Sequence, residues 1–222
     1  MPENVGELAV PIRTSVCCAI VVSVVSYTSL KRDAARRRTK NYDGVICHRM
    51  AFTIWFTGLS AAGKSTLALS TAEILAVRGI PHQVIDGDEL RRGPCADLGY
   101  SREDRRENIR RAAGLCERLN ASGTVVIAAL ISPYRDDRDE ARRIIGVDRF
   151  HEVYLSTPLS VCEFRDPKGL YRRARAGEIV AFTGVNDPYE IPPAPQLTLD
   201  THLSSVAECM VKIRAYLNQG LL

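Results

Sequence analysis

The chain has 222 residues, of which 45% are hydrophobic and 25% charged, enough material for one globular domain with or without an extension. The formal net charge of +4 comes from residues 1–50, which hold eight Lys/Arg against four Asp/Glu, whereas residues 51–222 hold 22 of each. A nucleic-acid-binding domain usually carries its basic surplus on the folded part, so this distribution argues against nucleic acid as the partner.

Residues 1–49 differ in pattern from the rest and are predicted to be an N-terminal extension, either disordered or produced by an unnatural start. Met50, just before the first predicted strand, is a candidate natural start. Val16–Val25 is almost wholly apolar but too short to span a bilayer comfortably. Its basic residues follow it, unlike those of a secretory signal. Membrane contact of residues 16–40 is therefore the less favoured alternative.

Residues 50–222 are predicted to form the folded domain, because strands and helices alternate along them. The predicted strands are Phe52–Thr57, Gln83–Ile85, Thr124–Leu130, Val153–Leu155 and Leu197–Leu199. The predicted helices run from Lys64 to about Arg78, onward from Ser101, and from about Leu203 to Leu217. This order predicts an α/β fold, a doubly wound parallel sheet of about five strands with helices on both faces.

The stretch from Arg165 to Pro195 does not follow this alternation. It is rich in charged residues, glycine and proline, and it is predicted to be a long, mobile loop. Long loops in compact domains often serve as lids over a binding site, so a lid is expected here.

A phosphate-binding loop is the sharpest motif in the chain. Gly58-Leu-Ser-Ala-Ala-Gly63-Lys64-Ser65 matches G-x-x-x-x-G-K-[ST] between a predicted strand and a predicted helix, which identifies the sheet as the P-loop NTPase type. The glycines let consecutive backbone N–H groups face phosphate oxygens, and the helix N-terminus adds positive potential. The residues expected to bind ATP are Gly58, Leu59, Ser60, Ala61, Ala62, Gly63, Lys64, Ser65 and Thr66.

Two carboxylates, Asp86 and Asp88, end the second predicted strand, which is expected to lie beside the phosphate loop. A kinase needs a carboxylate there, to hold Mg²⁺ through water or to accept the proton of the attacking hydroxyl. Lys64, Asp86 and Asp88 are therefore candidate catalytic residues, and Ser65 with Asp86 is the candidate Mg²⁺ site. Asp88 is also placed to cap a helix beginning at Glu89.

Several long strings resemble the adenylylsulfate kinase family, in the family's order and spacing, from about Phe52 to Thr201. These strings are Asp86–Gly93, Asp97–Arg111, Ile131–Arg135, Arg165–Tyr171, Ala174–Ile179, Phe182–Gly184 and Asp187–Glu190. The resemblance implies transfer of the γ-phosphate of ATP to the 3′-hydroxyl of adenosine 5′-phosphosulfate (adenylyl sulfate) in sulfate activation. It also implies a homodimer and a functional link to ATP sulfurylase.

The resemblance implies a set of substrate-binding residues as well. Arg91 and Arg105 occupy the positions where the family grips the phosphosulfate, with Asn108 on the same helix face as Arg105. Tyr100, where the family usually has Phe, and Phe182 would stack on adenine.

Three further residues complete that set. Lys168 in the lid would neutralise phosphate charge, and Ile131 and Ser132 follow a strand. Ser132 matches a serine described in some members as a phosphoserine intermediate. In-line transfer needs positioning and charge stabilisation without a covalent relay, so we assign Ser132 to substrate binding instead.

The chain departs from the usual family pattern without losing a phosphate-binding group. The departures are Ala61 for Gly, Glu89 for Asn, Arg92 for His, Pro94 for Leu, and Ala181 for Gly or Asn. An alanine in the phosphate loop is tolerated unless its φ is positive, where it would be strained.

Two other functions stay open at this point. One is a P-loop kinase acting on a nucleoside, gluconate or a similar hydroxyl compound, against which Arg91, Arg105 and Asn108 argue. The other is a nucleotide-binding regulatory domain without turnover, against which the intact Lys64 and Asp86 argue.

The chain contains seven cysteines, an odd number without the paired spacing of a metal site. We expect reduced thiols in the cytoplasm, most of them small core residues. They are Cys17, Cys18, Cys47, Cys95, Cys116, Cys162 and Cys209.

Overall fold

The computed structural model describes residues 51–222, so the predicted N-terminal extension and its possible membrane contact lie outside the described residues. The described residues form a five-stranded parallel sheet in the order β2-β3-β1-β4-β5. The strands are β1 (Thr53–Thr57), β2 (His82–Asp86), β3 (Val125–Ala129), β4 (Phe150–Leu155) and β5 (Leu197–Leu199). This confirms the predicted α/β fold.

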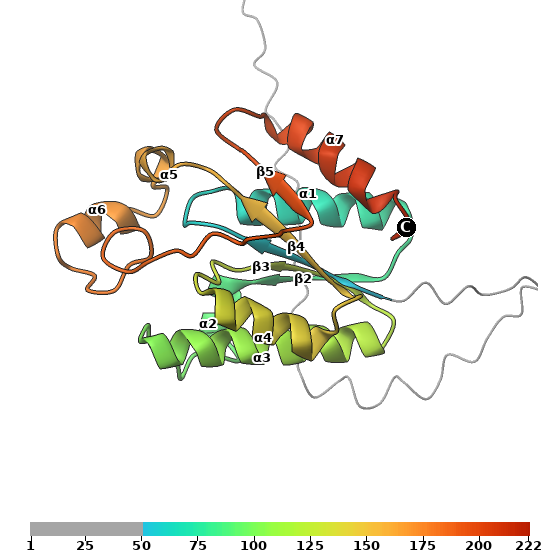
Figure 1. Ribbon diagram of the computed structural model, residues 1–222, viewed down its shortest axis with the longest axis horizontal. Coiled ribbons are helices and arrows are strands. Elements are labelled where there is room, and N and C mark those ends of the chain that lie inside the picture. The colour runs from blue at the N-terminus through green and yellow to red at the C-terminus, as the bar shows by residue number, and fades with distance from the viewer. Residues whose placement is uncertain (1–50) are drawn as a thin grey trace, which may run out of the picture. The chain divides into compact units, whose positions relative to one another are not determined.

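Seven helices connect and follow these strands in residues 51–222. They are α1 (Lys64–Val77), α2 (Gly87–Arg92), α3 (Arg102–Ala121), α4 (Arg135–Ile145), α5 (Leu159–Arg165), α6 (Leu170–Arg175) and α7 (Val206–Leu217). Figure 1 shows α1 and α7 on one face of the sheet and α2, α3 and α4 on the other. Both faces are therefore covered, as parallel sheets require.

The core divides into two layers that follow the alternation of strand side chains. In β1, Ile54 and Phe56 belong to the cluster that includes Leu67 of α1 and Ile213 of α7. Trp55 between them belongs to the cluster built on α3 and α4. Every residue of β1 and β3 is buried, which explains why both strands read as continuous apolar runs.

The helix α4 was not predicted, because its apolar residues, Ala141, Ile144 and Ile145, are confined to its second half. Its buried positions include Asp137 and Arg138 beside Ala141 and Ile145. Arg102 of α3 binds Asp137 through both carboxylate oxygens, at 2.8 and 2.9 Å. Charged side chains thus occupy the buried face that periodicity expects to be hydrophobic.

Asp86 at the end of β2 lies beside the phosphate loop, as predicted, although β3 separates β2 from β1. One prediction about this strand end needs correction. The helix after β2 is capped by Asp86, whose side chain accepts from the N–H of Asp88, so the cap lies two residues before the predicted Asp88. The last helix also begins at Val206, after a capping box of Ser205 and Glu208, later than the predicted Leu203.

The predicted lid stretch, Arg165–Pro195, contains α6, which projects from one end of the sheet with the turn that follows it (Figure 1). Its last third is fastened to the connection between β3 and α4. The N–H of Glu190 donates to the carbonyl of Pro133 at 2.8 Å, and the Tyr134 hydroxyl donates to Asp187 at 2.7 Å. The stretch therefore has a fixed C-terminal end.

Four of the cysteines, Cys95, Cys116, Cys162 and Cys209, are buried free thiols in the part of the chain that the structure describes. Burial raises the pKa of the Cys116 thiol to about 12, which keeps it protonated and inert. Within residues 51–222, no helix combines the length and apolar character needed to cross a membrane.

Asn120 at the end of α3 ties together the starts of two strands, and its removal tests the fold. Its side chain accepts from Thr53 at 2.8 Å and donates to the carbonyls of Phe52 and Thr124 at 3.0 and 2.9 Å. We expect Asn120→Ala to lower the free energy of unfolding by about 2–4 kcal/mol, because buried polar groups lose their partners.

Urea unfolding at 25 °C measures this change, with the exposed Asn218→Ala as the matched control, expected within about 0.5 kcal/mol of the parent. Since these contacts lie at the starts of the strands, away from the phosphate loop, ATP affinity should not change. Equal unfolding midpoints for the two variants would refute the assignment.

Candidate functional site

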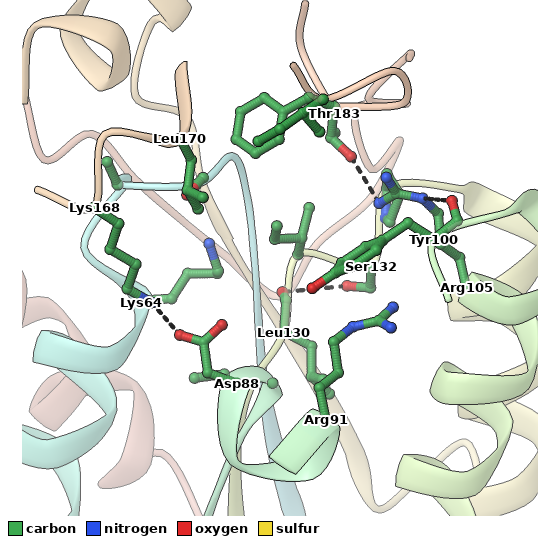
Figure 2. A pocket seen from close by; sticks show the side chains of 18 of the residues that line it. Lys64, Asp88, Arg91, Tyr100, Arg105, Leu130, Ser132, Lys168, Leu170 and Thr183 are labelled. Carbon is green, nitrogen blue, oxygen red and sulfur yellow. Dashed lines mark hydrogen bonds and ion pairs between the residues drawn. The ribbon is translucent and has the colours of Figure 1, made fainter. Parts of the chain in front are cut away.

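A cavity of about 840 Å³ opens at the carboxyl ends of β2 and β3, between the phosphate loop, α2, the start of α3 and the lid. Figure 2 shows Lys64, Lys168 and Asp88 on one side of this cavity and Arg91, Tyr100 and Arg105 on the other. Its size and its place at strand ends are typical of small-molecule sites in α/β proteins.

The phosphate loop adopts a conformation that requires glycine at two positions. Gly58 and Gly63 have φ of 148° and 98°. A Cβ at Gly58 would lie 2.9 Å from the carbonyl oxygen of Leu155, so the loop packs directly against the end of β4. This close approach holds the loop's N–H groups over the start of α1.

Lys64 is buried at the base of this loop. Its ammonium donates to the carbonyls of Gly58 and Leu59 at 3.0 and 2.6 Å. Burial, only partly offset by Asp86 and Asp88, lowers the pKa of Lys64 to about 8. The ammonium thus lacks a carboxylate in direct contact and is suited to receive an anionic ligand.

Ala61, a departure from the family pattern, has a φ of 59°. This is the left-handed region, where a Cβ meets the following carbonyl oxygen. Ala61 therefore has the positive φ at which an alanine is strained.

Ser65 and Asp86 face each other across the start of α1 and the end of β2. The Ser65 hydroxyl donates to Asp86 Oδ2 at 2.6 Å, while Asp86 Oδ1 caps α2. A hydroxyl and a carboxylate side by side are hard oxygen donors of the kind that Mg²⁺ prefers. Asp88 forms an ion pair with Lys168 of the lid, as Figure 2 shows.

On the opposite wall, Arg91 and Tyr100 lie against each other. The guanidinium of Arg91 is 4.3 Å from the centroid of the Tyr100 ring, and it donates to the carbonyl of Gly99 at 2.6 Å. Tyr100 is 61% exposed, so its ring presents a flat surface at the cavity. A cation and an open aromatic face suit a ligand with an anionic group and a base.

Asn108 lies deeper in the same wall and is 4% exposed. Its Nδ2 has no hydrogen-bond partner among residues 51–222. Buried amide donors are rarely left unpaired, and Asn108 lines the cavity, so this donor is available to a ligand.

Arg105 joins the start of α3 to the lid (Figure 2). Its three nitrogens donate to the Tyr100 carbonyl at 3.0 Å, the Thr183 hydroxyl at 3.1 Å and the Ala181 carbonyl at 2.6 Å. These contacts hold the Ala181 carbonyl and the Thr183 side chain, on either side of Phe182, whose ring packs edge-on against another lid aromatic. Arg105 therefore organises the cavity wall that Phe182 belongs to.

Ser132 is 2% exposed and its hydroxyl is fully engaged. It accepts from Trp55 Nε1 at 3.1 Å and donates to Thr57 Oγ1 at 2.9 Å. Its φ of 40° is an uncommon conformation for serine. These contacts hold the hydroxyl in place within the turn, and the assignment of Ser132 to substrate binding stays a prediction.

The structure brings most of the predicted site residues together around this one cavity. The exceptions are Gly58, Leu59 and Ala62, which do not line it. Thr183 and Arg173 line it and were not predicted. Neither belongs to a motif with a physical signature, and Thr183 contacts Arg105, which is far away in sequence.

Comparisons with known proteins agree with this geometry. The family model described as adenylylsulphate kinase matches residues 50–200. A protein of Shewanella amazonensis called adenylyl-sulfate kinase is 49% identical over 173 residues, which cover 78% of this chain and 87% of that protein.

Two solved structures are also similar. The Mycobacterium tuberculosis APS kinase in complex with AMPPNP and APS is 43% identical with a TM-score of 0.73, covering 77% of this chain and 99% of that one. A hexameric APS kinase from Thiobacillus denitrificans is 31% identical with a TM-score of 0.60, covering 79% of this chain and 30% of that one.

Relieving the strain at Ala61 should stabilise the protein. We expect Ala61→Gly to raise the free energy of unfolding by about 0.5–1 kcal/mol. Glycine removes the strain of the left-handed conformation, and the greater conformational entropy of the unfolded chain offsets part of this gain. The neighbouring Ala62→Gly is the matched control. It removes a fully buried methyl at a position without positive φ and should lower stability. Denaturant titration of both variants decides, and a loss of stability in Ala61→Gly would contradict the strain.

The lowered pKa of Lys64 predicts a pH dependence of ATP binding. Phosphates favour the charged ammonium, so the pKa rises on binding, and a proton is taken up at pH values above about 8. Affinity should therefore fall as pH rises from ~8 towards ~10.

Calorimetry of ATP binding in buffers of different ionisation enthalpy measures the uptake. Lys64→Arg, which stays protonated, should abolish it. Equal affinity of the parent protein at pH ~7 and ~9.5 would contradict the prediction.

Proposed function

The chain belongs to the adenylylsulphate kinase family, and from this membership we propose that it transfers the γ-phosphate of ATP to the 3′-hydroxyl of adenosine 5′-phosphosulfate. The products are ADP and 3′-phosphoadenosine 5′-phosphosulfate. One observation carries the proposal. A single cavity has the phosphate loop on one wall, and an arginine, an open aromatic ring and an unpaired buried amide on the other.

ATP is held by the phosphate loop. The backbone N–H groups between Gly58 and Lys64 bind phosphate oxygens, and the Lys64 ammonium exchanges its loop carbonyls for the β- and γ-phosphates. The Ser65 hydroxyl and the Asp86 carboxylate, whose oxygens lie 2.6 Å apart, would hold Mg²⁺, which prefers hard oxygen ligands. When bound, it neutralises charge that develops on the transferred phosphoryl group.

Adenosine 5′-phosphosulfate occupies the opposite wall. Its base stacks between Tyr100 and Phe182, and its phosphosulfate meets the guanidinium of Arg91. Asn108 donates its free Nδ2 hydrogen to the substrate. Arg105 supports this wall by fixing the lid backbone next to Phe182.

In the reaction, the 3′-oxygen forms a bond to the γ-phosphorus as the bond to the bridging oxygen of ADP breaks. The hydroxyl proton passes to a carboxylate at the junction of β2 and α2. Asp86 already serves Ser65 and the α2 cap, so Asp88 is the freer acceptor once Lys168 turns from it to the phosphates. Ser132 stays a positioning group throughout.

The same family membership supports a place in cytoplasmic sulfate assimilation, with ATP sulfurylase as the functional partner that supplies adenylyl sulfate. Four buried free thiols fit a reducing compartment. We propose a homodimer as the assembly.

Turnover of the purified full-length chain tests the proposal. We expect ADP release with MgATP to depend on micromolar adenylyl sulfate and to be absent with gluconate or nucleosides. In Asp86→Asn it should fall by about 100-fold or more, because a charge at the metal and phosphoryl group is lost. Asn caps a helix as well as Asp does, so α2 should remain intact.

Coupled detection of ADP measures the rates, and circular dichroism confirms the fold of the variant. Turnover with gluconate or a nucleoside instead would point to another small-molecule kinase. Nucleotide binding without any turnover would point to a regulatory domain.

A further inference from the structure

Arg138 of α4 is 2% exposed and links three segments that meet behind the acceptor wall of the cavity. Its Nε pairs with Glu152 of β4 at 2.9 Å. One terminal nitrogen donates to the backbone carbonyl of Ser132 at 2.8 Å, and the other to that of Glu190 at 2.7 Å. Arg138 does not itself line the cavity.

The hydrogen bond from Arg138 to the Ser132 carbonyl holds a strained residue. Ser132 has a φ of 40°, a conformation that persists only where its surroundings impose it. The Arg138 guanidinium fixes its carbonyl, and Trp55 and Thr57 fix its hydroxyl. Ser132 and the neighbouring Ile131 line the cavity, so the conformation of this turn shapes the substrate wall.

The hydrogen bond from Arg138 to the Glu190 carbonyl holds the C-terminal end of the lid. Besides the bond from Arg138, Glu190 accepts from the N–H of Arg135 at 2.7 Å through its side chain. The hydroxyl of the preceding Tyr189 lies 2.8 Å from Thr57 Oγ1. Thr57 also bonds Ser132, so the lid end and the Ser132 turn share their supports.

We propose that Arg138, oriented by Glu152, is a positioning residue for the acceptor substrate. It sets the Ser132 turn and the lid anchor together without touching either substrate. The inference rests on the proposed function for the identity of the acceptor. It predicts that losing the arginine impairs use of adenylyl sulfate and spares ATP, whose phosphate loop Arg138 does not contact.

A purely structural ion pair is the competing explanation, and Arg142 offers a matched control. Arg142 binds the other oxygen of Glu152 at 3.1 Å and lies 4.7 Å from the Phe150 ring centroid. Among residues 51–222, Arg142 forms no hydrogen bond or ion pair with Ser132 or Glu190. Arg142→Met therefore removes an ion pair of the same carboxylate and leaves the Ser132 turn in place.

The experiment compares full-length Arg138→Met and Arg142→Met. In Arg138→Met, Glu152 keeps Arg142 as partner, which limits the loss of stability. The double variant Arg138→Met/Glu152→Met guards against failure to fold, since replacing both partners of a buried pair with apolar residues is often tolerated. Steady-state kinetics give kcat and separate KM values for ATP and adenylyl sulfate.

We expect Arg138→Met and the double variant to raise KM for adenylyl sulfate by about tenfold or more and to lower kcat, with KM for ATP within about twofold. In Arg142→Met, kcat and both KM values should stay within about twofold of the parent protein. Arg138→Lys, which keeps charge but not the fork of donors, should recover only part of the loss. Equal effects of the Arg138 and Arg142 variants on KM for adenylyl sulfate would overturn the proposal.

Trp55 gives a second readout that needs no turnover. It is the only tryptophan in the chain, and its indole donates to the Ser132 hydroxyl. Its emission should shift in Arg138→Met and stay unchanged in Arg142→Met. If the parent protein does not use adenylyl sulfate, the proposed function fails. The Trp55 emission of the two variants still tests whether Arg138 positions the Ser132 turn. An unchanged Trp55 signal in folded Arg138→Met would then overturn the positioning role.

Discussion

The close approach of the phosphate loop to the end of β4 is the constraint on which the rest of the site depends. With a Cβ at Gly58 the loop would run into the Leu155 carbonyl, so only glycine lets the loop settle there. That position buries Lys64 beneath the loop and places Ser65 within 2.6 Å of Asp86, two strands away. The nucleotide half of the cavity thus follows from backbone packing at a parallel strand end.

The acceptor half is built differently, from buried polar side chains on helices. Arg105, Asn108 and Arg138 are each 8% exposed or less, and burying such groups is unfavourable unless they are paired. Arg105 and Arg138 donate hydrogen bonds to backbone carbonyls of the lid and of the Ser132 turn. These bonds compensate the burial of the two guanidinium groups and hold both segments in place. The Nδ2 donor of Asn108 has no partner among residues 51–222, and a bound ligand would supply the acceptor.

The parts of this architecture that depend on local sequence could be predicted. The apolar β1 and β3, the phosphate loop and the start of α1 each carry a signature within a few residues. The helix α4 carries none, since Asp137 and Arg138 are buried through partners on α3 and β4. The cap moved from Asp88 to Asp86 because both residues suit that role and only tertiary placement selects between them.

The contacts of Arg105 with Ala181 and Thr183 span more than seventy residues, so no periodicity reveals them. The family resemblance identified Arg105 as a site residue, but only the structure shows what it holds. The same applies to the φ of Ala61, which no sequence pattern reports.

The position of the transferred phosphate tests the central claim most directly. Phosphorus–proton correlation NMR of the product formed from MgATP and adenylyl sulfate would locate the new phosphomonoester. The account predicts coupling to the ribose 3′-proton, with the sulfate–phosphate anhydride intact. A phosphate at another position, or release of inorganic phosphate without a new ester, would contradict it.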